Sequence, residues 1–207
     1  MAEKNSAAIR DALTALAAGE AIVYPTETFY ALGVDALSPD ALERLFAIKG
    51  REPGKPVALI AADSAMAFAV AREIPAQARV LAEAFWPGPL TLILPAREGI
   101  PAALIGADGG VGVRVSSHPI ARALAAGLQR PLTATSANLA GEPPAVEPES
   151  ARRAFGNEVK VFVEGGRLAG GAPSTMVSVN RTGIRVLRPG AVSERQLAAA
   201  LRANASR

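Results

Sequence analysis

Short apolar runs alternate with helix-like segments along most of the chain. Runs at 21–24, 57–61, 91–94 and 131–135 have the length and composition of buried strands. Between the runs, apolar residues recur at helical spacing or follow capping signals. These patterns predict helices at 6–18, 38–49, 63–72, from 75 to about 86, 119–126, 148–155 and 193–203. The alternation of the two element types predicts an α/β fold.

Hairpin signals modify this prediction. Residues 173–188 resemble two strands around a turn from Asn180 to Gly183, 111–117 alternates as a strand, and 160–166 is strand-like. A mixed sheet is therefore expected instead of a purely parallel one. We find no internal repeat or convincing linker, which predicts a single domain over 1–207, with a core of about 6–190 and a final helix near 193–203.

The candidate functional residues are most closely spaced in the segment from the first apolar strand to residue 60. A turn rich in threonine, which includes Thr28, follows Pro25 at the carboxyl end of the strand, where ligands collect in open α/β sheets. The helix that starts at Ser38-Pro39 delivers Lys49 as it ends near Gly50, and Arg51 and Lys55 follow on a Gly/Pro loop. Three cations so close together would suit a phosphate chain. The same KGREPGK segment is also typical of a solvated surface loop.

Composition narrows the chemistry further. The 207 residues include no cysteine and one histidine, His118, which excludes disulfides and thiolate chemistry and makes a histidine-based zinc site nearly impossible. The net charge of +3 is compatible with RNA as well as with anionic substrates. Residues 1–19 lack the apolar core of a signal peptide, and no later run is long enough to span a membrane. We therefore expect a soluble, cytoplasmic protein.

Three further clusters are candidates for binding. Arg114 lies inside a strand-like segment, so it needs either a structural carboxylate or an anionic ligand. Ser136 and Asn138 follow a strand and could hold a phosphate or small polar substrate, although such residues more often cap turns. Ser174 follows a glycine-rich loop, with Arg188 further on. Neither a P-loop nor a dinucleotide-binding glycine motif is present, so a nucleotide would be bound by another scheme.

The motifs occur together in a recognisable order. The series YPTETFYALG, KGREPGKP, WPGPLTLIL, VRVSSHP, TSANLAGEPP, PSTMV and RPG, spanning about 21–190, resembles the YrdC-like family, whose bacterial members are threonylcarbamoyl-AMP synthases. The most specific part is the pairing of Lys49-x-Arg51 with Ser136-x-Asn138. A paralogous group of unknown role degrades these pairs, whereas both are intact here. The chain is similar to the short form of the family.

The resemblance implies a twisted open mixed sheet flanked by helices around a basic concave cavity. It also implies an enzyme, a nucleotidyltransferase that forms L-threonylcarbamoyladenylate and pyrophosphate from L-threonine, bicarbonate and ATP. Mg²⁺ is expected mainly on the ATP phosphates, with no dedicated metal ligands. A tRNA threonylcarbamoyl-transferase complex would then transfer the group to the tRNA adenosine next to the anticodon.

The matching motif positions imply roles for nine residues. They are Lys49 and Arg51 in catalysis, Lys55, Asn138 and Arg188 in ATP binding, and Thr28, Arg114, Ser136 and Ser174 in binding threonine or its carbamate. The stretch after Ser136 is expected to close over ATP. Three positions depart from the family pattern: Ala31 replaces a glycine, Ser116 a proline and Ala140 a serine. These small replacements affect local backbone geometry more than function.

Two other functions remain alternatives. An RNA-binding YrdC-like protein without synthase activity would fit the basic charge and would bind structured RNA with a steep salt dependence and no ATP turnover. For the synthase itself, weak binding of RNA or tRNA is expected. Only 4% of residues are aromatic, however, which gives no support for readout by base stacking. A carbamoyl-adenylate-forming enzyme of hydrogenase maturation would normally carry a zinc-finger segment, which a chain without cysteine cannot form.

Overall fold

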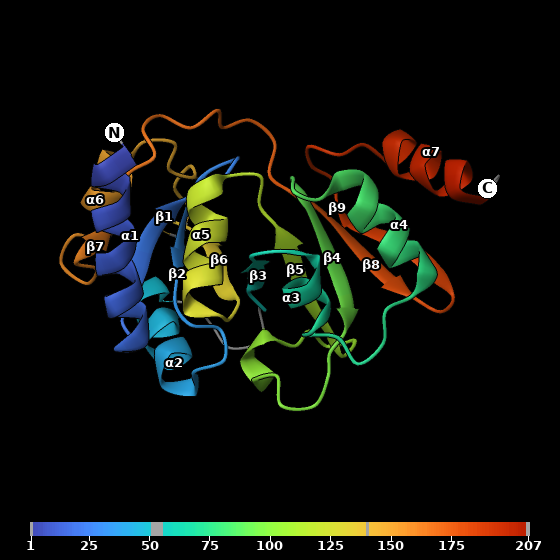
Figure 1. The fold of residues 1–207 in the computed structure, drawn as a ribbon, viewed down its shortest axis with the longest axis horizontal. Helices are drawn as coiled ribbons and strands as arrows, with labels where there is room; N and C mark the ends of the chain where they lie inside the picture. Colours follow the sequence, from blue (N-terminus) through green and yellow to red (C-terminus); the bar gives the residue numbers. More distant parts are fainter. Residues whose placement is uncertain (1, 51–55, 140, 206–207) are drawn as a thin grey trace.

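The computed structural model describes residues 2–50, 56–139 and 141–205. Within these residues, nine strands form one mixed sheet in the order β7-β1-β2-β6-β3-β5-β4-β8-β9, which extends across the molecule in Figure 1. The strands are β1 (Ile22–Pro25), β2 (Tyr30–Gly33), β3 (Ala58–Ala61), β4 (Leu90–Pro95), β5 (Gly110–Val115), β6 (Leu132–Ser136), β7 (Val161–Phe162), β8 (Thr175–Asn180) and β9 (Gly183–Arg188).

Helices flank the sheet, as expected from the alternating pattern. The α-helices are α1 (Ala2–Ala17), α2 (Pro39–Lys49), α3 (Ser64–Phe68), α4 (Ala76–Phe85), α5 (Pro119–Leu128), α6 (Pro148–Phe155) and α7 (Glu194–Ala205), with a 3₁₀ turn at Ala102–Leu104. Among the described residues, no helix is long and apolar enough to cross a membrane.

The pairing of the strands confirms the mixed sheet. β1 and β2 form an antiparallel hairpin, as do β8 and β9, whereas β3 runs parallel to β5 and β4 parallel to β8. The antiparallel strand β6 joins the two halves by pairing with β2 and β3. This arrangement brings the end of β6 next to the hairpin that carries the threonine-rich turn.

Two apolar layers cover the sheet. Leu59 and Val113 are cross-strand neighbours that belong to the larger core. Ile60 and Leu132, paired on the opposite face, pack with residues of α1 and α5, whose ribbons lie side by side in Figure 1. This second layer leaves the rest of that face available for a cavity.

The structure differs from the prediction at three elements. The strand β2 was not predicted, and it is buried along its whole length between β1 and β6. The helix expected at 63–72 ends at Phe68, because the chain turns there to form an isolated bridge between Ala71 and Ala96. The strand expected at 160–166 has only two paired residues, since β7 pairs only with Ile22 and Val23 of β1.

Candidate functional site

A cavity of about 460 Å³ lies against the sheet and collects most of the predicted site residues. Thr28, Arg114, Ser136, Ser174 and Arg188 all contribute to its wall, although they come from five separate segments of the chain. The remaining lining residues are Thr26, Phe29, Tyr30, Ala31, Pro56, Val57, Ala58, Ala134, Thr135, Pro144, Pro173 and Met176.

Small side chains on neighbouring strands make room for this cavity. Ala58 of β3 and Ala134 of β6 form a cross-strand pair, and Ala31 of β2 pairs with Ser136. Paired residues point to the same face of a sheet, so these positions form a shallow floor. Two residues further along the same face, Ile60 and Leu132 are larger and pack beneath α5. The change in side-chain size therefore marks the edge of the cavity.

The turn after β1 holds Thr28 in place. The Thr26 hydroxyl donates to the carbonyl of Phe29 (2.7 Å) and accepts from the backbone N–H groups of Thr28 and Phe29 (3.3 Å each). The two threonine hydroxyls are also hydrogen-bonded to each other, with 3.2 Å between their oxygens. Both side chains are buried in the wall of the cavity. The turn thus presents a fixed hydroxyl to a small polar ligand.

Ser174 and Arg188 form a second fixed group. The Arg188 guanidinium donates to the carbonyl of Ser174 (2.8 Å) and to its hydroxyl (3.1 Å), and that hydroxyl is hydrogen-bonded to Thr91 (2.9 Å). Burial, together with the positive charge of Arg114, lowers the pKa of Arg188 from its ordinary value. Two guanidinium groups therefore act on the same cavity, which suits an anionic ligand.

Arg114 has a carboxylate partner, which answers the question left open by the sequence. Its Nη1 forms an ion pair with Oε1 of Glu27, and the other oxygen of that carboxylate accepts a hydrogen bond from the Ser116 hydroxyl. Arg114 also lines the cavity. The residue is thus both part of a buried ion pair and available to a ligand.

Lys49 connects the two motif pairs. Its ammonium group donates to the backbone carbonyls of Ser136 (3.0 Å) and Asn138, and lies 5.4 Å from the centre of the Phe155 ring. α2 is capped at Ser38 and at Gly50 as predicted, so Lys49 occupies its last turn. The structure therefore places the C-terminal end of this helix against the loop that follows β6.

Asn138 lies next to the main cavity, in a neighbouring cavity of about 560 Å³ between residues 137–139 and 142–146 and α6. Its amide group donates to the carbonyls of Leu139 and Glu142, which ties the loop together. Its side-chain oxygen is buried and has no hydrogen-bond partner in the part of the chain that the structure describes. Arg51 and Lys55 fall outside the described residues, but Pro56, which follows them directly, lines the main cavity.

Sequence reasoning missed the residues that hold the predicted ones. Thr26 supports Thr28, Thr91 supports Ser174, and Glu27 with Ser116 supports Arg114. Of these, Thr26 and Glu27 were visible as part of the polar turn, whereas Thr91 lies within an apolar run and gave no signal of its own.

The His118 ring is not one of the groups that hold the cavity residues just described. Its Nδ1 accepts a hydrogen bond from the backbone N–H of Ile120 (3.3 Å) and so caps α5. Burial lowers the pKa of His118, an effect that Arg122 reinforces and Glu27 opposes. Within residues 2–50, 56–139 and 141–205, no group of three His, Cys, Asp or Glu side chains could hold a metal ion. The predicted site residues that the structure describes carry hydroxyl, amide and cationic groups, and the carboxylate of Glu27 is paired with one of the cations.

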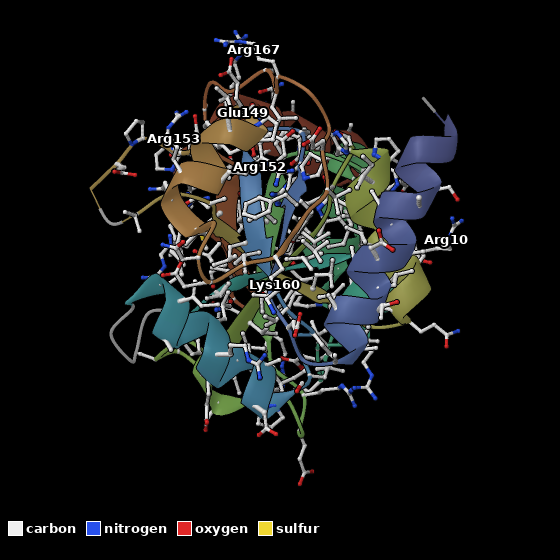
Figure 2. The ribbon with its side chains drawn as sticks, turned by 90° about the vertical axis from the view of Figure 1, so that its left-hand side faces the viewer. Arg10, Glu149, Arg152, Arg153, Lys160 and Arg167 are labelled. Carbon is white, nitrogen blue, oxygen red and sulfur yellow. The ribbon has the colours of Figure 1, made fainter. Side chains whose placement is uncertain are left out.

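The end of the molecule formed by α1, α6 and β7 carries several basic side chains (Figure 2). Two of its arginines are paired with acidic residues: Arg152 with Glu164 at 2.8 Å, and Arg167 with Glu147. This mixture of charges differs from the unpaired basic stripe typical of an RNA-binding face.

Comparison with known proteins identifies the family of this chain. The family model that covers Sua5, YciO and YrdC proteins, described as telomere recombination, matches residues 14–190. The chain belongs to the YrdC-like family. Its fold is similar to that of E. coli YciO, whose crystal structure has a TM-score of 0.81 and 28% identity, covering 91% of this chain and 92% of that one.

Several relatives are called threonylcarbamoyl-AMP synthases. The protein of Nitrosococcus oceani is 39% identical over 86% of this chain and 96% of its own length. The protein of Pyrococcus abyssi is 36% identical over 88% of this chain, which spans only about half (54%) of that longer relative. The crystal structure of P. abyssi Sua5 with L-threonine has a TM-score of 0.89 and 34% identity, covering 93% of this chain and 57% of that one.

Proposed function

We propose that this protein is a threonylcarbamoyl-AMP synthase, working as a single domain over 1–207. The observation that carries the proposal is the convergence of Thr28, Ser136, Ser174, Arg114 and Arg188 on one cavity. The synthases among its relatives, and the L-threonine bound to the Sua5 protein, support the same function.

The chemistry requires binding and charge neutralisation more than proton transfer. L-Threonine and bicarbonate give a carbamate with loss of water, and a carbamate oxygen then attacks the α-phosphorus of ATP, which expels pyrophosphate. Bringing two anions together is the main barrier, and fixed cations lower it. A site of hydroxyls, amides and cations can supply these effects without histidine or cysteine.

Each predicted residue has a place in this scheme. Arg114 would bind the carboxylate of threonine, and the hydroxyls of Thr28, Ser136 and Ser174 would bind its polar groups. Arg188 and Asn138 would hold the nucleotide. Lys49, together with Arg51 and Lys55 beyond the described residues, would neutralise the triphosphate and the carbamate.

Mg²⁺ would be held mainly by the phosphate oxygens of ATP. This fits the residues present, because Glu27, the carboxylate next to Arg114, is already engaged by Arg114 and Ser116. When bound, Mg²⁺ supplies charge neutralisation at the phosphates. We further propose that the protein acts in the cytoplasm, binds RNA or tRNA weakly, and passes its product to a tRNA threonylcarbamoyl-transferase complex.

The test is pyrophosphate release by the purified protein with ATP and Mg²⁺, omitting L-threonine and bicarbonate in turn. Release that requires both supports the synthase, with Lys49→Ala as the inactive control. Release without threonine, or no release, would refute it. A protein that binds structured RNA but releases no pyrophosphate would be an RNA-binding module, and release dependent on carbamoyl phosphate would indicate a carbamoyl-adenylate enzyme.

A further inference from the structure

A carboxylate beside a site for anions needs an explanation. Glu27 carries a negative charge directly behind Arg114, and that charge disfavours the approach of an anionic substrate. The two side chains are only 11% and 8% exposed, respectively, so the charge is poorly screened by water. A residue that works against substrate binding in this way must contribute something that outweighs its electrostatic effect.

The contacts of Glu27 fix its carboxylate on both sides. One oxygen is paired with Nη1 of Arg114, and the other accepts from the hydroxyl of Ser116. The Ser116 oxygen in turn accepts from the backbone N–H of His118 (3.1 Å), so its own proton points toward Glu27. The carbonyl of Ser116 is held by Arg122 (2.7 Å). The carboxylate therefore has a single well-defined orientation.

This orientation determines how the guanidinium of Arg114 faces the cavity. A guanidinium has five N–H donors in a rigid plane, and Glu27 engages it through Nη1 only. The other donors of Arg114 find no hydrogen-bond partner among the residues that the structure describes, and its side chain lines the cavity. Anchoring one corner of the plane leaves a fixed edge for a second carboxylate, which is the geometry of bidentate recognition.

Glu27 also offsets the positive charge of one of the two cavity arginines, Arg114. The charge of Arg114 acts on Arg188 strongly enough to help lower the pKa of the latter. Without the negative charge of Glu27, repulsion from Arg188 would drive Arg114 toward other rotamers, because its stem has several rotatable bonds. The pair with Glu27 thus keeps Arg114 in place while the cavity is empty.

We infer that Glu27, held by Ser116, is a positioning residue that aims Arg114 at the carboxylate of the substrate amino acid. The inference rests on the proposed function, because it takes threonine as the ligand of Arg114. Glu27 itself does not touch the substrate. Its effect should therefore fall on the affinity for the amino acid and leave the affinity for ATP unchanged.

The test compares Glu27→Ala, Glu27→Gln and Ser116→Ala with the wild type in the pyrophosphate assay. Glu27→Ala should raise the KM for L-threonine about 10- to 100-fold and change the KM for ATP less than about twofold, since a charge-assisted hydrogen bond is lost at one substrate only. Glu27→Gln keeps an oxygen for Arg114 and should recover most of the affinity. Ser116→Ala should give a smaller rise in the KM for L-threonine, and it tests the inference even if Glu27→Ala does not fold.

A matched control separates positioning from stability. Asp35 is also buried and paired with an arginine, Arg130, at 3.0 Å, but it does not line the cavity. Asp35→Ala should lower Tm while leaving the KM for L-threonine unchanged. An equal rise in that KM for the Asp35 variant, or no rise for Glu27→Ala, would overturn the inference.

A second measurement uses binding alone. Isothermal titration should show that the wild type prefers L-threonine to L-threoninamide, which lacks the carboxylate, and that Glu27→Ala loses much of this preference. An unchanged preference in the variant would overturn the inference. A wild type that binds neither compound and releases no pyrophosphate would refute the proposed function instead, so the two failures are distinguishable.

Discussion

Gly33 is a position of the sheet at which a methyl group would not fit unless its neighbours moved. It ends β2, and a methyl group there would lie 2.5 Å from the carbonyl oxygen of Thr133 and 2.6 Å from Cε1 of Tyr24. Neither neighbour can move alone, because Tyr24 is fully buried and its hydroxyl donates to that same carbonyl (2.8 Å). Overpacking of this kind costs about 1–3 kcal/mol.

Gly33→Ala should therefore lower the free energy of unfolding by about 2 kcal/mol, which corresponds to a fall in Tm of roughly 4–8 °C for a domain of this size. Calorimetry measures the shift. Because β2 also pairs Ala31 with Ser136, we expect the KM for L-threonine to rise as the floor of the cavity shifts.

Gly112→Ala provides the matched control on the same sheet. A methyl group at Gly112 of β5 would meet only ordinary contacts: Thr91 at 3.5 Å, and Ala58 and Ile93 at 3.7 Å each. This variant should keep its Tm, or its free energy of unfolding should rise by about 0.4–1 kcal/mol, because alanine restricts the unfolded chain. If both variants lost the same stability, or Gly33→Ala lost none, steric crowding at Gly33 would not be the cause.

Two further predictions concern Ser174 and the single histidine. Thr91→Val keeps the shape of a buried side chain but removes the hydroxyl that holds Ser174. The KM for L-threonine should therefore rise, while the free energy of unfolding falls by only about 1 kcal/mol. An unchanged KM would show that the Thr91 hydroxyl does not hold Ser174 for the substrate. Burial lowers the pKa of His118 below its ordinary value of about 6.5. Just below that pH the unfolded chain therefore binds more protons than the folded one, so stability falls as the pH drops. His118→Asn can still cap α5 and should flatten this fall between about pH 7 and 5 in urea unfolding; an equally steep fall in the variant would contradict the assignment.

Helix ends that are fixed by neighbouring residues could be predicted from the sequence. Ser38 and Gly50 were recognised as the ends of α2, and the structure confirms that the Ser38 hydroxyl accepts from Ala41 and that Gly50 adopts a left-handed conformation. At the start of the helix predicted at 193–203, the Gln196 side chain accepts from the backbone N–H of Ser193 and the Ser193 hydroxyl accepts from that of Gln196. These contacts lie within four residues in the sequence, so the pattern alone was sufficient.

Elements that depend on distant partners were harder to predict. β2 is four residues long and becomes a strand because β1 and β6 lie on either side of it, which no local window reveals. The carboxylate partner of Arg114 is 87 residues away in the sequence, and the hydroxyl partner of Ser174 is 83 residues away. The motifs predicted a set of site residues, of which Thr28, Arg114, Ser136, Ser174 and Arg188 line one cavity, whereas only the fold could identify what holds them.

The predicted ligand-binding side chains Thr28, Ser174 and Arg114 are each held by a neighbouring polar side chain, so their hydroxyls and guanidinium are already oriented in the empty cavity. A reaction limited by bringing anions together gains most from such orientation, because no reorganisation is needed as charge develops. The only histidine meanwhile serves as a helix cap. If the proposed function holds, the residues that orient these side chains affect the affinity for the amino acid, so changes to them should appear first in the KM for threonine.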